Sequence, residues 1–211
     1  MAFGLRQAVR PKLNVEDLAP KCLTSRLLPQ LFDGIEDKQN VSVLDLGGGT
    51  PSTLAFFSNL DVPARVTFGD VMTQRHNFQP EEDEVATNFD SAVQRWRDYL
   101  DLDTADQIDY LLIWDFLHYF EPPVVEALSY ALQPHLHRST KAYGFGTLRS
   151  DSPLNGSRCA VSNAASLNMM PLPEPLPFSH SQQVIAENFV CLQITRATLL
   201  QEGHLELLFE A

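Results

Sequence analysis

The chain has few cysteines and no long apolar run. Its three cysteines, Cys22, Cys159 and Cys191, contain no C-x-x-C pair. This pattern argues against a zinc site or a disulfide framework and favours free thiols in a reducing cytoplasm. No stretch of about 20 uninterrupted apolar residues is present, so we expect no membrane span. The first twelve residues also lack the apolar core of a signal peptide.

Basic residues are scarce, with 15 Lys and Arg against 27 Asp and Glu, a formal net charge of −12. Phosphate contacts need clustered cations, so we do not expect a nucleic-acid partner. Arg6, Arg10 and Lys12 do cluster, and we interpret residues 1–19 as a solvated N-terminal arm. With 44% apolar residues, the chain predicts one domain with a substantial core over residues 20–211.

The most informative segment is V-S-V-L-D-L-G-G-G-T-P-S, residues 41–52. An apolar, β-branched run ends at Asp45, three glycines follow, and Pro51 suits the first turn of a helix. The order predicts a buried strand, a tight turn and a helix. Glycines permit positive φ and a close approach by a ligand, toward which the helix presents free N–H groups. The alternative is a glycine-rich β–α turn that binds nothing.

Two cofactor classes use such a turn. Dinucleotide enzymes need G-x-G-x-x-G, and here Gly47 and Gly49 match but Ser52 occupies the third position. The segment D-L-G-G-G-T-P-S resembles motif I of the class I S-adenosylmethionine (SAM)-dependent methyltransferases, with Asp45 as its acid. Pro51 replaces the usual third glycine of that motif.

A second acid follows at a suitable distance. Residues 64–70, A-R-V-T-F-G-D, predict a second strand ending at Asp70, 21 positions after Gly49. An acid that binds a ribose diol is expected about 20 residues after the glycine turn. We therefore favour ribose binding by Asp70, with a turn cap as the alternative.

The rest of the chain continues the β–α rhythm and ends in a hairpin. We expect strands at 108–120 and 140–148, helices at 85–100, 124–137 and 181–189, and two final antiparallel strands at 190–200 and 204–209. The predicted fold is α/β: a Rossmann-like three-layer sandwich with a mostly parallel sheet and an antiparallel C-terminal strand. Class I methyltransferases end with such an inserted antiparallel strand, whereas typical dinucleotide folds end in parallel strands.

Two regions differ from a standard core of this kind. No convincing third strand appears between Asp70 and Asp109, where the helix at 85–100 stands alone. Residues 150–180 are rich in Ser and Pro and are long for a connection within a compact domain, which favours a lid or a mobile insertion.

The resemblance implies a SAM site built from both strand ends and the glycine turn. The implied cofactor-binding residues are Asp45, Gly47, Gly48, Gly49, Thr50, Asp70 and Asp115. The segment W-D-F-L-H-Y-F-E-P-P resembles the family's fourth-strand motif, which runs beside the methyl donor. Asp115 either contacts the methionine portion or caps the next helix, and His118 is either a general base or a hydrogen-bonded core histidine. We expect no metal site.

Three functions remain open. The first is a SAM-dependent methyltransferase acting on a small-molecule or protein acceptor, with the acceptor and the oligomeric state left unspecified by the sequence. The second is a methyltransferase-like binding or regulatory module without catalysis. The third, disfavoured by Ser52 and the terminal hairpin, is a nucleotide-cofactor oxidoreductase.

Overall fold

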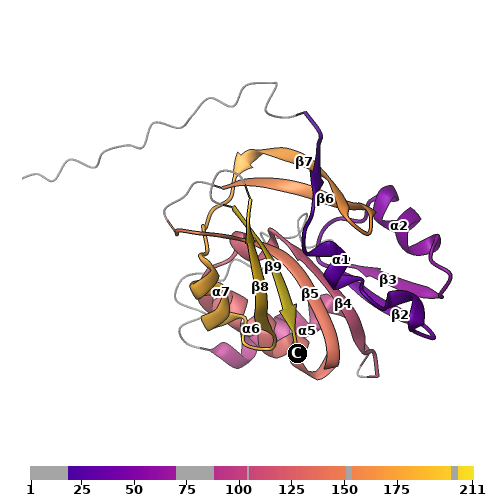
Figure 1. Ribbon diagram of the computed structural model, residues 1–211. Coiled ribbons are helices and arrows are strands. Elements are labelled where there is room, and N and C mark those ends of the chain that lie inside the picture. The colour runs from indigo at the N-terminus through magenta and orange to yellow at the C-terminus, as the bar shows by residue number, and fades with distance from the viewer. Residues whose placement is uncertain (1–18, 70–87, 104, 151–153, 201–203) are drawn as a thin grey trace, which may run out of the picture.

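A six-stranded sheet forms the centre of the protein. Figure 1 shows the computed structural model, which describes residues 19–69, 88–103, 105–150, 154–200 and 204–211. The strand order is β3-β2-β4-β5-β9-β8. The strands are β2 (Val41–Asp45), β3 (Ala64–Phe68), β4 (Ile108–Trp114), β5 (Leu136–Thr147), β8 (Gln193–Leu199) and β9 (His204–Glu210).

The sheet is parallel except at β9. Strand β2 pairs in parallel with β3 and β4, and β4 pairs in parallel with β5. Strand β9 is antiparallel to both of its neighbours, β5 and β8. The predicted α/β fold with an antiparallel C-terminal strand is therefore confirmed, as is the terminal hairpin. The first strand of the hairpin is shorter than expected, because β8 spans Gln193–Leu199, whereas β9 begins at His204 as predicted.

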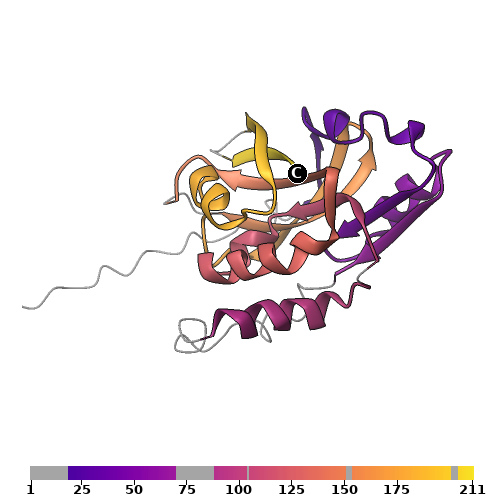
Figure 2. The same cartoon turned by 90° about the horizontal axis from the view of Figure 1, so that it is seen from below.

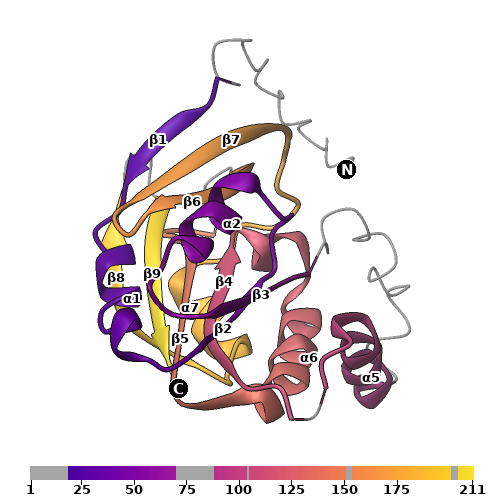
Figure 3. The same cartoon turned by 90° about the vertical axis from the view of Figure 1, so that its right-hand side faces the viewer.

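Helices cover both faces of the sheet (Figures 2 and 3). On one face, α1 (Leu28–Leu31) and α2 (Pro51–Ser58) share a buried cluster with Val43, Tyr110 and Leu208 of the strands. The opposite face carries α5 (Phe89–Leu100), α6 (Pro122–Leu132) and α7 (Gln182–Asn188), which pack on alternate strand residues. Short 3-10 turns are η2 (Ile35–Asp37), η4 (Phe116–Tyr119) and η5 (Gln133–His135). The layers are those expected of a doubly covered parallel sheet.

The predicted insertion forms a hairpin. Strands β6 (Asn155–Asn163) and β7 (Ser166–Pro175) pair antiparallel, and β1 (Lys21–Thr24) joins β7 on its other side. Strand β6 lies beside α2 in Figure 3. Strand β1 pairs only with residues 166–169, so the prolines of β7 fall where one side of the strand is unpaired. Proline is tolerated there because no ladder donor is lost.

The sequence-based boundaries differ from the structure at several ends. The expected strand 108–120 stops at Trp114 and continues as η4, and α6 ends at Leu132 rather than at 137. Among the described residues, β3 is the edge strand beside β2, so no third strand is seen there. Asp70 and residues 1–18 of the arm predicted over 1–19 lie outside the described residues. No helix in the described part has the length and apolarity needed to cross a bilayer.

Candidate functional site

The glycine segment connects β2 to α2, as the sequence predicts. Strand β2 ends at Asp45 and α2 begins at Pro51, its first helical position. The Thr50 hydroxyl caps the helix by accepting a hydrogen bond from the Thr53 backbone N–H at 3.2 Å. Thr50 is also buried. In this arrangement Thr50 is a helix cap, and its side chain is engaged within the protein.

Two of the three glycines of this segment, Gly47 and Gly49, are needed for space rather than for an unusual backbone. Gly34 is the only glycine of the described chain with a positive φ, so the positive φ that glycines permit is not used at this turn. A Cβ on Gly47 would lie 2.8 Å from Cδ1 of Trp114, and one on Gly49 would lie 3.2 Å from the Phe68 ring. A Cβ on Gly48 would make only ordinary contact, 3.9 Å from Arg158. Aromatic rings of the protein itself approach this backbone.

Asp45 is a buried carboxylate with one unpaired oxygen. Its Oδ1 accepts hydrogen bonds from the Gly47 N–H at 2.9 Å and from Nε1 of Trp114 at 2.6 Å. Its Oδ2 has no partner among the described residues. Burial raises the pKa of Asp45 to about 6, against the lowering effect of the two hydrogen bonds. An unsatisfied buried oxygen is costly, so this atom is a point where a ligand donor or a water would stabilise the site.

Asp115 is the second buried carboxylate at this sheet edge. It follows the last residue of β4, and its Oδ2 accepts a hydrogen bond from the Ser157 N–H at 2.6 Å. Burial raises the pKa of Asp115 to about 7, although that hydrogen bond acts in the opposite direction. Its side chain makes no capping bond to η4. Of the two roles that the sequence leaves open, helix capping is therefore absent from the structure.

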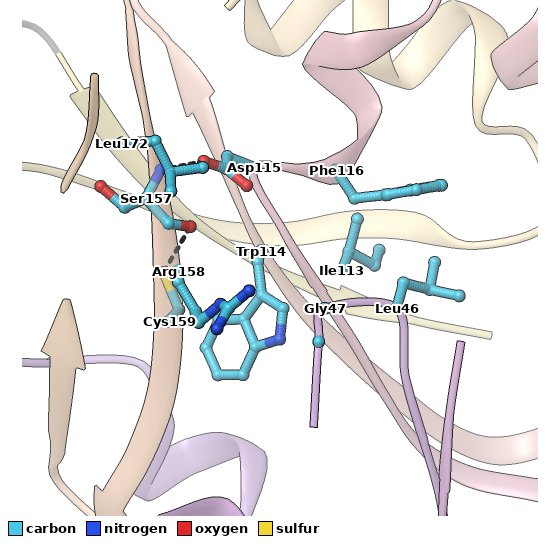
Figure 4. Close-up of a pocket in the computed structure, with 11 residues that line it drawn as sticks. Leu46, Gly47, Ile113, Trp114, Asp115, Phe116, Ser157, Arg158, Cys159 and Leu172 are labelled. Carbon is cyan, nitrogen blue, oxygen red and sulfur yellow. Dashed lines mark hydrogen bonds between the residues drawn. The ribbon is translucent and has the colours of Figure 1, made fainter. Parts of the chain in front are cut away.

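A small cavity lies between the glycine segment, the end of β4 and strand β6 (Figure 4). Its volume is about 40 Å³. The lining residues are Leu46, Gly47, Gly48, Ile113, Trp114, Asp115, Phe116, Ser157, Arg158, Cys159 and Leu172. Figure 4 draws Arg158 beside the Trp114 indole. Most of this wall is apolar, with one carboxylate and one guanidinium on it.

Strand β6 is fastened over the glycine segment by the first turn of α2. The Ser52 hydroxyl donates to the Val161 carbonyl at 2.8 Å, and the Thr53 hydroxyl accepts from the Val161 N–H at 3.0 Å. Ser52 thus takes part in a contact that a glycine at the third motif position would not make. Both polar groups of one β6 residue are held by α2, which keeps β6 close to the glycines.

His118 does not face the cavity as a free base. It is fully buried in η4. Its Nε2 lies 3.2 Å from the Phe145 carbonyl, and its Nδ1 accepts the His180 N–H at 3.0 Å. These bonds place the ring proton on Nε2, and burial lowers the pKa of His118 to about 3. Both nitrogens are occupied, so this geometry favours the core histidine of the two alternatives over a general base.

The structure thus brings together most of the residues that the sequence singled out. Asp45, the three glycines, Thr50 and Asp115 lie at one edge of the sheet, whereas His118 is directed into the core and Asp70 lies outside the described residues. Sequence reasoning missed the contribution of β6. Ser157, Arg158 and Cys159 come from a segment with no recognisable motif, and only the hairpin pairing places them here. Among the described residues, no His, Cys, Asp and Glu side chains gather as a metal site.

Comparisons with known proteins give structural neighbours only. No family model matches the chain, and no curated protein matches its sequence. The solved 1,6-didemethyltoxoflavin-N1-methyltransferase of Burkholderia thailandensis has 17% identity and a TM-score of 0.48, over 88% of this chain and 76% of that one. A SAM-dependent methyltransferase of Clostridium acetobutylicum has 8% identity and a TM-score of 0.48, over 89% and 92%. At these identities and TM-scores, neither the ligand nor the reaction of these proteins can be assigned to this chain.

The chain's own strand order decides the fold. Four parallel strands are followed by β9, inserted antiparallel between β5 and β8. The protein has the class I methyltransferase fold. Within this fold, the described chain lacks a strand beyond β3 and carries the β6–β7 hairpin over the glycine segment.

Proposed function

We propose that the protein binds SAM over the glycine segment and transfers its methyl group to a small-molecule or protein acceptor. The observation that best supports this proposal is the pair of buried carboxylates, Asp45 and Asp115, at the ends of the neighbouring parallel strands β2 and β4. Open α/β sheets bind ligands at this edge. Buried carboxylates favour cations, and SAM carries a sulfonium and an ammonium group.

The same charges argue against a dinucleotide. A pyrophosphate placed on the glycines would meet two acidic side chains that are already costly to ionise. Arg158 is the one cation on the described cavity wall, and it lies 3.9 Å from the Cβ position of Gly48. One guanidinium with an opposing carboxylate matches a zwitterion such as the amino-acid end of SAM better than it matches a pyrophosphate.

The backbone elements fit SAM, but the free volume does not accommodate a whole nucleoside. Ligand pockets for such molecules measure about 300–1,000 Å³, and the cavity here measures about 40 Å³. The positions that the glycines leave open hold the rings of Trp114 and Phe68. Binding of the whole cofactor therefore requires a ring to move.

The second function, a module without catalysis, is favoured by the same filled space and by the lack of a histidine on the described cavity wall. Asp115 is the only carboxylate on the described cavity wall. It is thus the group best placed to receive a proton from an acceptor, and a base is needed only for some acceptors.

The thiols of Cys22, Cys159 and Cys191 are all free, and we keep the cytoplasm as the proposed compartment.

Titration separates these functions. We expect SAM and S-adenosylhomocysteine (SAH) to bind by calorimetry and to raise the melting temperature, and we expect NAD⁺ to do neither. Asp45→Asn should weaken SAM binding about tenfold, because a charged acceptor is lost. Asp98→Asn, an exposed change on α5, serves as the control.

Turnover is tested with methyl-labelled SAM and cell extract, followed by mass analysis of labelled products. A labelled product supports the methyltransferase. Saturable binding without any labelled product supports the module, and absence of binding to SAM and SAH contradicts both.

A further inference from the structure

Trp114 stands at the centre of the candidate site in an unusual backbone conformation. It is the last residue of β4 and has a φ of 56°, and apart from glycine only Asp101 shares a positive φ within the described chain. A bulky residue in this region is strained, and such strain concentrates at functional sites. The register with β5 shifts between Leu112 and Trp114. The end of β4 is therefore shaped to present this one side chain.

The indole lies where a ligand on the glycines would lie. Its Cδ1 is 2.8 Å from the Cβ position of Gly47, and its Nε1 donates to Asp45 at 2.6 Å. The ring packs edge-on against Tyr143, with centroids 5.9 Å apart. Trp114 is buried and forms part of the cavity wall beneath β6 (Figure 4).

Two glycines make room for this residue. Gly47 admits the ring, and Gly144 of β5 admits the backbone, because a Cβ there would lie 3.0 Å from the Trp114 carbonyl oxygen. The missing Cβ atoms of Gly47 and Gly144 therefore leave room for the ring and for the backbone of Trp114, and both positions fit this residue.

We propose that Trp114 is an access-controlling residue, whose indole occupies the glycine segment in the free protein and leaves it when a ligand binds. This inference rests on the proposed function, since it names the residue that a nucleoside-sized ligand has to displace. The cavity left beside the indole holds only a few water molecules, so the ligand cannot enter while the ring stays.

The displacement also selects the ligand's chemistry. When the indole leaves, Asp45 loses the Nε1–H donor on Oδ1, and Oδ2 has no described partner from the start. A ligand compensates only if it brings a hydrogen-bond donor or a positive charge to this carboxylate. A purely anionic ligand does not, so Trp114 and Asp45 together favour cationic ligands or ligands rich in hydroxyl groups.

Fluorescence tests the movement directly, because the chain has two tryptophans. Trp96 is in the core, where its Nε1 donates to the Val124 carbonyl. Trp96→Phe leaves Trp114 as the only indole. In this variant we expect weak acrylamide quenching in the free protein, and a red-shifted emission with several-fold stronger quenching when SAH saturates the site. Trp114→Phe, which reports Trp96 alone, is the control and should show no change on SAH addition.

Affinity tests the control of access. Removing the indole in Trp114→Ala removes the closed state that competes with the ligand, so SAH should bind at least about tenfold more tightly than to the wild type. If SAH saturates Trp96→Phe by calorimetry while its emission and quenching stay unchanged, the inference is overturned and the proposed function stands. If folded Trp114→Ala binds SAH more weakly than the wild type, Trp114 is a contact residue and the inference is likewise overturned.

Failure of the proposed function gives a different result. In that case neither the wild type nor folded Trp114→Ala binds SAM or SAH, and the inference falls with it. Should Trp114→Ala fail to fold, judged by circular dichroism, the fluorescence of Trp96→Phe decides the question alone.

Discussion

The substitution Asp115→Asn tests the electrostatics of the site without a ligand. Asp115 is buried at the end of β4, and its Oδ2 accepts the Ser157 N–H at 2.6 Å. Asparagine keeps an acceptor oxygen of similar size for that bond and removes the ionisation. The two proteins should therefore differ mainly in how stability depends on pH.

The sign follows from the direction of the pKa change. Burial raises the pKa of Asp115 from 3.8 in a model peptide to about 7 in the folded protein. The folded state then keeps a proton that the unfolded chain has released. The stability that protonated Asp115 contributes is fully present below the unfolded pKa of 3.8 and is lost as the pH rises through the folded pKa of about 7. By linkage, the wild type should lose about 2–3 kcal/mol relative to the variant between about pH 5 and about pH 8.

Urea unfolding of both proteins across this pH range measures the difference. Burial lowers the pKa of His118 to about 3, so His118 acts oppositely and costs stability as the pH falls below its ordinary value of 6.5. Because both proteins contain His118, its contribution cancels in the comparison. Asp98→Asn on α5 gives the effect of removing an exposed carboxylate. A difference between wild type and Asp115→Asn that stays constant with pH would refute the reasoning.

The other expected outcomes concern packing and hydrogen bonds near the glycines. Gly47→Ala should lower stability by about 1–3 kcal/mol, because its Cβ would lie 2.8 Å from an indole carbon, whereas Gly48→Ala, with 3.9 Å to its nearest neighbour, should melt like the wild type. Equal melting of the two variants would contradict this. Thr53→Val should lower the free energy of unfolding, measured in urea, by about 1–2 kcal/mol, because the buried N–H of Val161 in β6 loses its acceptor. His118→Asn should lower the free energy of unfolding by about 1–3 kcal/mol and keep SAM affinity within about twofold, because the ring makes two buried hydrogen bonds. A variant that keeps its stability but loses turnover would instead support His118 as a general base.

The local pattern of the sequence predicted the parallel core well. The run from Val41 to Ser52 specifies a strand, a turn and a capped helix through β-branched residues, glycines and Pro51, and β2 and α2 follow it. The hairpin at the C-terminus was equally clear, because alternating residues flank a short turn. These signals come from residues adjacent in the sequence, so they can be recognised without knowledge of tertiary contacts.

The details of the site depend on contacts between distant segments, and the sequence could not supply them. Arg158 and Ser157 reach the cavity beside the glycines only because β6 pairs with β7 and docks on α2. The one available signal was the spacing of Pro171, Pro173 and Pro175 at every second position, which suits a strand with one unpaired side. The glycines permit a positive φ that the structure does not show, because the neighbouring rings, not the turn, require the missing Cβ atoms of Gly47 and Gly49.

Charge links Trp114 to the carboxylates. Asp45 and Asp115 lie where the fold places ligands, and burial makes both costly to ionise there. In the free protein the Trp114 N–H gives Asp45 one of its two donors and covers it from water. Displacing the indole removes that donor, so the energy of opening is recovered only by a ligand that carries donors or positive charge. The closed site and the proposed preference for ligands with donors or positive charge therefore have one cause, the buried negative charge beside the glycines.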